Sequence, residues 1–268
     1  MATMLLSHRF RGQPGKPVLL FLHGFIGRGD DWDSIAGNFE DDYAILTVDL
    51  PGHGGSYPLA DSDPAHFSMS GCGSLLTGLI DHYEINTCHV IGYSMGARLA
   101  LYLATHHADR FRRFVIESGS PGLRTESERE ERRRRDAELA KGLKATPMEE
   151  FLKQWYSQPL FSSLDQRSDT FREMLRRRLE INSDGLALSL EHMGTGAQPP
   201  LWDRLPQVDP KVLFIAGELD RKFYRLAAEM AHLCPNGELA IIAGAGHNVH
   251  VEQPELYREQ LLSFLTTE

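Results

Sequence analysis

The chain has 268 residues, of which 41% are hydrophobic and 24% are charged, a composition close to that of soluble globular proteins. Its 28 basic and 37 acidic side chains give a net charge of −9, which disfavours non-specific binding to nucleic acid or to anionic lipid surfaces. We expect neither a membrane span nor an export signal, because the longest strongly apolar run is only residues 18–22. Cys72, Cys88 and Cys234 are scattered, which predicts neither a disulfide framework nor a zinc site. The sequence therefore predicts a cytoplasmic globular protein without a metal.

Short apolar runs bounded by turn residues recur in the first part of the chain and predict buried strands. They cover residues 18–22, 44–48, 89–93 and 114–117. Between the last two lies a segment, residues 97–104, whose apolar side chains have helical spacing. This alternation of strands and helices with long crossovers predicts a parallel sheet covered by helices, an α/β fold.

The pattern changes between residues 126 and 190 to charged segments with leucines at helical spacing. Helices are predicted over 136–143, 148–155 and 171–181, followed by the prolines 199, 200 and 206, and then by strands over 212–216 and 239–243 with a helix over 224–233 between them. We therefore predict one core domain formed by residues 1–118 and 207–268, and a helical cap inserted as residues 119–206. The predicted cap holds 12 of the 22 arginines of the chain.

The segment Gly92-Tyr93-Ser94-Met95-Gly96 is a G-x-S-x-G motif between a predicted strand and a predicted helix, which is the setting of a nucleophile elbow. In such a turn the serine adopts strained backbone angles, and the glycines avoid clashes with the neighbouring chain. Ser94 is therefore predicted to project above the sheet. The N–H of Met95, at the start of the helix, and the N–H of Phe25, after the first strand, are the predicted oxyanion-hole donors.

A serine hydroxyl is unreactive without a base, and the sequence offers a carboxylate and a histidine after later strands. Asp220 follows the strand over 212–216, and His247 follows the last strand in a glycine-rich loop. Ser94, Asp220 and His247 thus occur in the chain order of the α/β hydrolases. The alternatives that remain open are Glu218 or Asp209 as the carboxylate and His250 as the base.

Arg98 stands one helical turn after Ser94, on the face of the predicted helix that is nearest to the serine. A cation at the start of a helix opposes the helix dipole, at a cost of about 0.3–1 kcal/mol. Either a local Asp or Glu offsets this cost, or Arg98 holds a substrate carboxylate. The arginine runs 132–135 and 176–178 offer further candidates, of which we expect about one per run to face a pocket. Trp155 is predicted to be either cap core or pocket wall.

Several segments together resemble a known family. The landmarks of the α/β hydrolases are found at 21–25, 49–54, 92–96 and 246–247, and the chain resembles these proteins over nearly its whole length. More narrowly it is similar to the MenH family, the 2-succinyl-6-hydroxy-2,4-cyclohexadiene-1-carboxylate synthases of menaquinone biosynthesis. The segments that carry this narrower resemblance are 92–98, 117–123, 131–132, 155–159 and 217–223.

The resemblance implies a lyase that eliminates pyruvate from 2-succinyl-5-enolpyruvyl-6-hydroxy-3-cyclohexene-1-carboxylate, with no cofactor and with the serine removing a ring proton. Arg98, Arg132 and Arg178 match the arginines that bind substrate carboxylates in that family, and Tyr93 and Trp155 match its pocket residues. Arg176 or Arg177 remains an alternative to Arg178. The residues leave a second reading open, a serine hydrolase acting on a carboxylated ester or on a carbon–carbon bond. Under either reading the expected partner is a small anionic substrate, and the expected assembly is a monomer or a small homo-oligomer.

Overall fold

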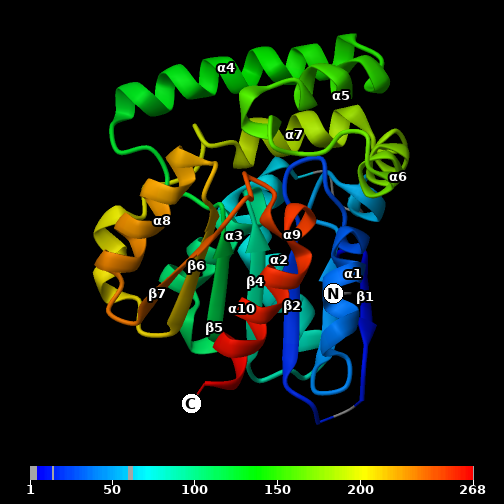
Figure 1. Cartoon of the computed structure of the whole chain (residues 1–268). Helices are drawn as coiled ribbons and strands as arrows, with labels where there is room; N and C mark the ends of the chain where they lie inside the picture. The colour runs from blue at the N-terminus through cyan, green and yellow to red at the C-terminus, as the bar shows by residue number, and fades with distance from the viewer. Residues whose placement is uncertain (1–4, 14, 60–62, 268) are drawn as a thin grey trace.

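The computed structural model describes residues 5–13, 15–59 and 63–267, and the remaining residues of the predicted core range, 1–4, 14, 60–62 and 268, lie outside the described residues. Figure 1 shows a central sheet with helices on both faces and a layer of helices above the carboxyl ends of its parallel strands. None of the helices in the described part of the chain has the length and the apolar character needed to cross a membrane.

The sheet has the strand order β1-β3-β2-β4-β5-β6-β7, in which β1 pairs antiparallel with β3 and the other neighbours pair in parallel. The strands are β1 (His8–Arg11), β2 (Val18–Leu22), β3 (Ala44–Val48), β4 (Cys88–Tyr93), β5 (Phe111–Glu117), β6 (Lys211–Gly217) and β7 (Gly237–Ile242). The α-helices are α1 (Asp33–Ala36), α2 (Met69–His82), α3 (Met95–His106), α4 (Glu126–Ala145), α5 (Met148–Tyr156), α6 (Asp169–Arg178), α7 (Ser183–Met193), α8 (Arg221–Leu233), α9 (Val249–Glu252) and α10 (Pro254–Thr266). Short 3-10 helices are η1 (Gly29–Trp32), η2 (Gly37–Phe39), η3 (Gly54–Ser56), η4 (Pro64–Phe67), η5 (Ala108–Arg110), η6 (Pro159–Phe161) and η7 (Trp202–Gln207).

The predicted α/β class and all six predicted strands are confirmed, with differences of up to three residues at their ends. The predicted helices over 97–104 and 224–233 lie within α3 and α8. In the middle of the chain, the predictions over 136–143 and 148–155 lie within α4 and α5, whereas the prediction over 171–181 runs past the end of α6 at Arg178. The edge strand β1 and the helices α1, α2, α7, α9 and α10 were not predicted as separate elements from the sequence.

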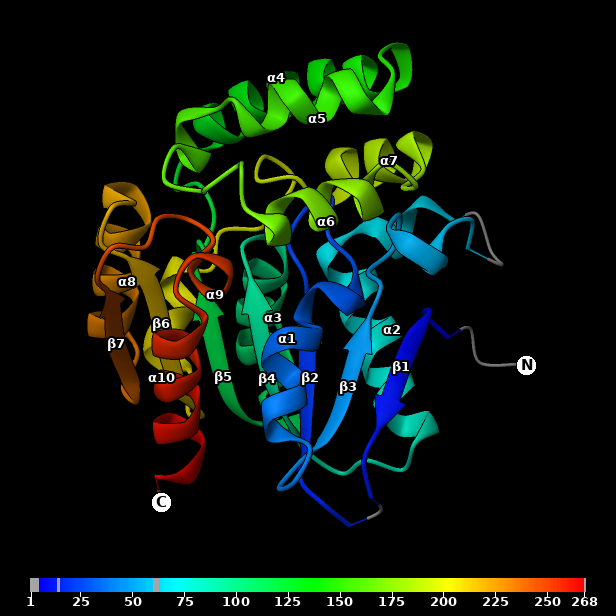
Figure 2. The same ribbon diagram turned by 45° about the vertical axis from the view of Figure 1, so that its right-hand side comes forward.

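The core forms two apolar layers because side chains of a strand alternate between the two faces of the sheet. On β2, Leu20 and Leu22 pack with residues of α2, α3 and α8, whereas Leu19 and Phe21 pack with residues of α1 and α10. Figure 2 shows α1 and α10 together in front of the sheet, with α2 and α3 behind it. All four of these β2 side chains are fully buried, as expected for a central strand of a parallel sheet.

A third apolar cluster joins α4, α5, α6 and α7 above the sheet. Its members from these helices include Leu143, Phe151, Phe171 and Leu186, and Ile26 reaches it from the loop after β2. The four helices are consecutive in sequence and lie between β5 and β6. Because they bury their apolar faces mainly against one another, they support our proposed division into a core and an inserted cap.

Candidate active site

Ser94 lies at a strained turn between β4 and α3. Its backbone angles are φ 51° and ψ −103°, and its N–H donates a hydrogen bond of 2.9 Å to the carbonyl of Glu117. The glycines on either side are required by the packing, because a Cβ atom at Gly92 would lie 2.5 Å from the carbonyl oxygen of Gly96, and one at Gly96 would lie 2.2 Å from that of Leu22. The G-x-S-x-G segment thus forms the tight turn that the motif indicates.

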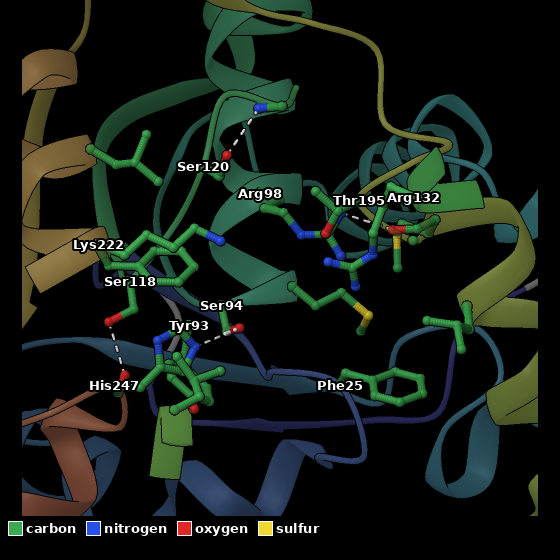
Figure 3. Close-up of a pocket in the computed structure, with 18 of the residues that line it drawn as sticks. Phe25, Tyr93, Ser94, Arg98, Ser118, Ser120, Arg132, Thr195, Lys222 and His247 are labelled. Atoms are coloured by element: carbon green, nitrogen blue, oxygen red, sulfur yellow. Dashed lines mark hydrogen bonds between the residues drawn. The ribbon is translucent and has the colours of Figure 1, made fainter. Parts of the chain in front are cut away.

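A chain of hydrogen bonds connects this serine to a histidine and an aspartate, and Figure 3 shows the bond between Ser94 and His247. His247 Nε2 lies 3.1 Å from Ser94 Oγ, and His247 Nδ1 lies 2.8 Å from Asp220 Oδ2. A carboxylate accepts hydrogen bonds, so Nδ1 carries the proton and Nε2 is free to accept the proton of the serine hydroxyl. The side chains of His247 and Asp220 are only 2% and 7% exposed, which holds this geometry away from bulk water.

The alternative carboxylates and the alternative base lie elsewhere. Glu218 accepts the N–H of Gly244. Asp209 precedes β6, so it lies at the amino ends of the parallel strands, whereas Ser94 lies at their carboxyl ends. His250 instead pairs with the buried carboxylate of Glu117, at 2.8 Å from Nδ1 to Oε2. The alternative of His250 as the base was therefore wrong, because its ring pairs with a carboxylate at the end of β5 while His247 faces Ser94.

Ser118 and Phe223 support the histidine, a role that was not predicted for either residue. Ser118 Oγ donates a hydrogen bond of 2.8 Å to the carbonyl of His247, and the ring of Phe223 packs edge-on against the imidazole with 4.5 Å between centroids. Asp220 is further fixed because its Oδ1 accepts the N–H of Phe223 at the start of α8. A serine directly after a buried strand, beside the elbow strand, was the available signal for Ser118.

The two predicted oxyanion-hole donors lie on either side of the serine. Met95 is the first residue of α3, where helix N–H groups have no partner within the helix, and Phe25 follows β2; both residues line the cavity above Ser94. His23 fixes the loop that carries Phe25, since it donates from Nδ1 to the carbonyl of Gly24 and accepts the N–H of Leu50 at Nε2. Burial lowers the pKa of His23, which keeps the imidazole in the neutral form that these two bonds need.

A cavity of about 550 Å³ opens above Ser94, between the core and the cap. It is lined by all five residues predicted to bind substrate, namely Tyr93, Arg98, Arg132, Trp155 and Arg178. Of the arginines at 132–135, only Arg132 is among the described residues that line the cavity. Of those at 176–178, only Arg178 is among them. In the described part of the chain, no group of three or more His, Cys, Asp or Glu side chains is arranged to hold a metal ion.

Arg98 lies deep between core and cap, with part of its surface facing the cavity. Its Nη1 donates to the carbonyl of Met193 at 2.8 Å and to Gln198 Oε1 at 3.1 Å. Burial lowers the pKa of Arg98 to about 10, with nearby Arg132 adding to this effect and Asp136 opposing it. No carboxylate is ion-paired with Arg98 among the described residues. The acidic influence on Arg98 comes from Asp136 of the cap, which itself binds Arg132, rather than from an ion pair within α3.

Arg132 and Arg178 reach the cavity with partners already in place. Arg132 Nε donates to Asp136 at 2.7 Å, and Arg178 Nη2 donates at 3.2 Å to Asp31, a residue of η1 in the core. Burial by itself raises the pKa of Asp31, but the cations around it, Arg178 first, outweigh this and hold the pKa below its usual value. Asp31 was not found by the sequence analysis, because its partner stands 147 positions away in the chain.

Trp155 forms part of the pocket wall and also packs on the cap core. The sequence had left open which of these two roles it has. Its ring lies edge-on to Phe25 at 5.3 Å between centroids, and it stacks on Phe151 of the cap cluster at 6.0 Å. Trp155 thus brings the cap into contact with the loop that carries a predicted oxyanion-hole donor.

Comparison with known proteins identifies the family. The model of the alpha/beta hydrolase family matches residues 19–260. The chain is 37% identical to the 2-succinyl-6-hydroxy-2,4-cyclohexadiene-1-carboxylate synthase of Citrobacter koseri, over 91% of each chain, and 35% identical to that of Pectobacterium atrosepticum, over 94% of this chain and 95% of the relative. Among solved structures, MenH from S. aureus matches with a TM-score of 0.90 and 34% identity, covering 96% of this chain and 97% of that one. The chain therefore belongs to the α/β-hydrolase family and, within it, to the lyase family of 2-succinyl-6-hydroxy-2,4-cyclohexadiene-1-carboxylate synthases, the MenH family.

Proposed function

We propose that this enzyme eliminates pyruvate from 2-succinyl-5-enolpyruvyl-6-hydroxy-3-cyclohexene-1-carboxylate in menaquinone biosynthesis, with Ser94 as the base. The observation that carries the proposal is the position of Arg98, a cation without a carboxylate partner among the described residues, in the cavity onto which the Ser94–His247–Asp220 chain opens. A cation so placed favours an anionic substrate held beside the serine.

The elimination starts with proton transfer at Ser94. The hydroxyl passes its proton to His247 Nε2 as its oxygen removes a proton from the substrate ring, and Asp220 stabilises the imidazolium that forms. The electron pair of the broken C–H bond forms a new C=C bond, and the C–O bond to the enolpyruvyl group breaks. The leaving enolate takes a proton, for which the imidazolium is the nearest source, and becomes pyruvate. No bond between Ser94 and the substrate is needed.

Removal of a weakly acidic ring proton requires stabilisation of the negative charge that develops on the substrate. The N–H groups of Met95 and Phe25 are the donors that we assign to this task. Donors held by a helix N-terminus and by a loop fixed through His23 need little reorganisation during the reaction, which is what makes such groups effective. The chemistry needs neither a metal nor an organic cofactor.

The substrate carries three carboxylates, and the cavity offers guanidinium groups from both the core and the cap. Arg98 comes from α3, whereas Arg132 and Arg178 come from α4 and α6. Binding that uses all three draws the cap onto the core, and this would exclude water from the reacting atoms. Tyr93 and Trp155 complete the wall of the cavity.

The proposal includes the setting of the enzyme. We propose a core of residues 1–118 and 207–268 with a cap of residues 119–206, a cytoplasmic location, and a monomer or small homo-oligomer. A small anionic substrate rather than nucleic acid is the proposed partner, in keeping with the net charge of −9 and with the local enrichment of arginine at the cavity.

Pyruvate release from the enolpyruvyl substrate, coupled to a lactate dehydrogenase assay, tests the proposal. We expect turnover well above the spontaneous rate, and its loss in Ser94→Ala. Release at the spontaneous rate would contradict the proposal. A carboxylate-bearing ester tests the serine-hydrolase reading in parallel, because that reading alone predicts an acyl-enzyme on Ser94 that mass spectrometry detects.

A further inference from the structure

The cationic side chains that line the cavity differ in what they are paired with. They are Arg98, Arg124, Arg132, Arg178 and Lys222. Arg124 forms an ion pair with Glu229, and its guanidinium lies 3.5 Å from the centre of the Trp202 ring. Arg132 and Arg178 pair with the carboxylates described above. Lys222 also lines the cavity, and it forms no ion pair with any of the described residues.

Lys222 stands in the first turn of α8, two residues after Asp220. A cation at this end of a helix is opposed by the helix dipole, so the helix itself does not explain its presence. Its ammonium lies 5.1 Å from the centre of the Phe223 ring, and the same ring packs against His247. The side chain is therefore directed along Phe223 into the mouth of the cavity, and Figure 3 shows it extending towards Ser94.

Figure 3 also shows Lys222 on one side of Ser94, with Arg98 and Arg132 on the other. A ligand that reaches both sides must carry negative charge at two separated points, with the atoms between them above the serine hydroxyl. Lys222 is exposed, so its side-chain end is hydrated when no ligand is bound. The site thus offers two cationic ends to one anionic molecule.

We infer that Lys222 binds a substrate carboxylate on the side of Ser94 opposite to Arg98 and Arg132, so that the enzyme selects substrates with two separated carboxylates. This inference rests on the proposed function and specifies how the same site recognises its substrate. Lys222 positions the ring between its anionic ends, and it takes no part in the proton transfers.

Kinetics of pyruvate release by Lys222 variants test the inference. For Lys222→Ala we expect KM to rise about 10- to 100-fold while kcat falls less than about fivefold, because a charge-assisted contact is lost away from the reacting atoms. Lys222→Arg should keep kcat/KM within about fivefold of the wild type. Arg225→Ala is the matched control, since Arg225 is an exposed cation one turn further along α8 that does not line the cavity, and its kinetics should be unchanged.

Competitive inhibitors identify which carboxylate Lys222 binds. Weaker inhibition of Lys222→Ala by pyruvate assigns the enolpyruvyl carboxylate, weaker inhibition by succinate assigns the succinyl carboxylate, and a raised KM with both inhibitors unaffected assigns the ring carboxylate. Equal KM and inhibition constants for wild type, Lys222→Ala and Arg225→Ala, with an active wild type, overturn the role of Lys222 and leave the proposed function intact. Absence of pyruvate release by the wild type overturns the proposed function first, and the role of Lys222 with it.

Discussion

Two neighbouring cavities share the wall formed by Tyr93, Arg178 and Asn248, and their charged groups are organised differently. The cavity above Ser94 contains Arg98 and Lys222, for which the described residues provide no ion pair. The second cavity, of about 430 Å³, contains carboxylates and arginines that are paired with each other or with side chains just outside it. Its pairs are Asp30 with Arg28, Asp31 with Arg177 and Arg178, Asp33 with Arg9 and Arg11, and Glu173 with Arg176.

Each cavity is also lined by a histidine that pairs with a carboxylate at the same separation of 2.8 Å, His247 with Asp220 and His250 with Glu117. His247 directs its other ring nitrogen to Ser94, whereas the imidazole of His250 stacks on Trp32 with 4.3 Å between centroids. The two pairs therefore have the same separation but differ in the surroundings of the imidazole: one ring faces a serine hydroxyl and the other stacks on an indole. We infer that a histidine–carboxylate pair indicates catalysis only where a reactive hydroxyl completes it, and that the second cavity has a structural role.

The same substitution in both histidines should separate these roles most clearly. His247→Asn removes the acceptor of the serine proton, and we expect kcat to fall on the order of 10⁴-fold. His250→Asn keeps an N–H donor near Glu117, and we expect kcat within about tenfold of the wild type together with a lower melting temperature. Pyruvate release and thermal unfolding measure the two effects. A comparable loss of kcat in both variants would contradict the division between the cavities.

Replacing Asp220 and Glu117 by their amides tests the difference between the two cavities further. Asp220→Asn keeps the side-chain shape but no longer stabilises the imidazolium, so kcat should fall about 10²- to 10⁴-fold. Glu117→Gln should leave kcat within about fivefold and lower the free energy of unfolding by about 1–3 kcal/mol, because a buried charge-assisted hydrogen bond is weakened. Denaturant unfolding measures the second effect. Full stability of Glu117→Gln would show that the buried pair contributes little to the fold.

The sequence allowed prediction of the sheet and of the Ser94–Asp220–His247 chain because both depend on local signals. Short apolar runs indicated the strands, and glycines at fixed positions around the serine indicated the elbow. Helix α2 escaped prediction because Gly71 and Gly73 lower its helix propensity. The structure explains both glycines: a Cβ atom at Gly71 would lie 2.0 Å from the carbonyl oxygen of Ala65, and Gly73 lies where α2 packs on α3.

Apart from the Ser94–Asp220–His247 chain, the pairings between side chains far apart in sequence were beyond prediction. Nothing near Glu117 indicates that its partner is His250, because that pair forms only when β5 and α9 come together in the core. Nothing near Arg178 indicates Asp31, because that pair forms only when the cap packs on the core. The resemblance to the MenH family drew attention to Arg178 but said nothing of the carboxylate that holds it. Local patterns therefore indicated the reacting groups, whereas the fold was needed to distinguish the cavity cations that form ion pairs from those that form none with the described residues.

Loss of single arginines tests whether unpaired charge identifies the substrate site. Arg98→Ala should lower kcat/KM by about 10- to 1,000-fold, equivalent to about 1.5–4 kcal/mol, because a charge-assisted contact beside the serine disappears. Arg177→Ala is the matched change in the second cavity, and we expect kcat/KM within about threefold of the wild type. Steady-state kinetics of pyruvate release decide between them. A near-normal Arg98→Ala would assign Arg98 to structure.

The smallest effect concerns two buried histidines, His23 and His53, that form no ion pair with a carboxylate in the described part of the chain. Burial lowers both pKa values below that of the unfolded chain, so the unfolded state binds more protons as the pH falls below about 6.5. Stability is therefore full above this pH and decreases below it, by at most about 1.4 kcal/mol per pH unit for each histidine. Protonation of His23 would also remove the acceptor for the N–H of Leu50.

Denaturant unfolding between pH 7.5 and 5.5 measures this dependence. A His23→Gln variant should be less stable at pH 7.5, yet it should lose less stability on acidification than the wild type, because one of the histidines that take up a proton on unfolding is gone. Parallel pH profiles for the wild type and His23→Gln would show that the acid sensitivity arises elsewhere in the molecule.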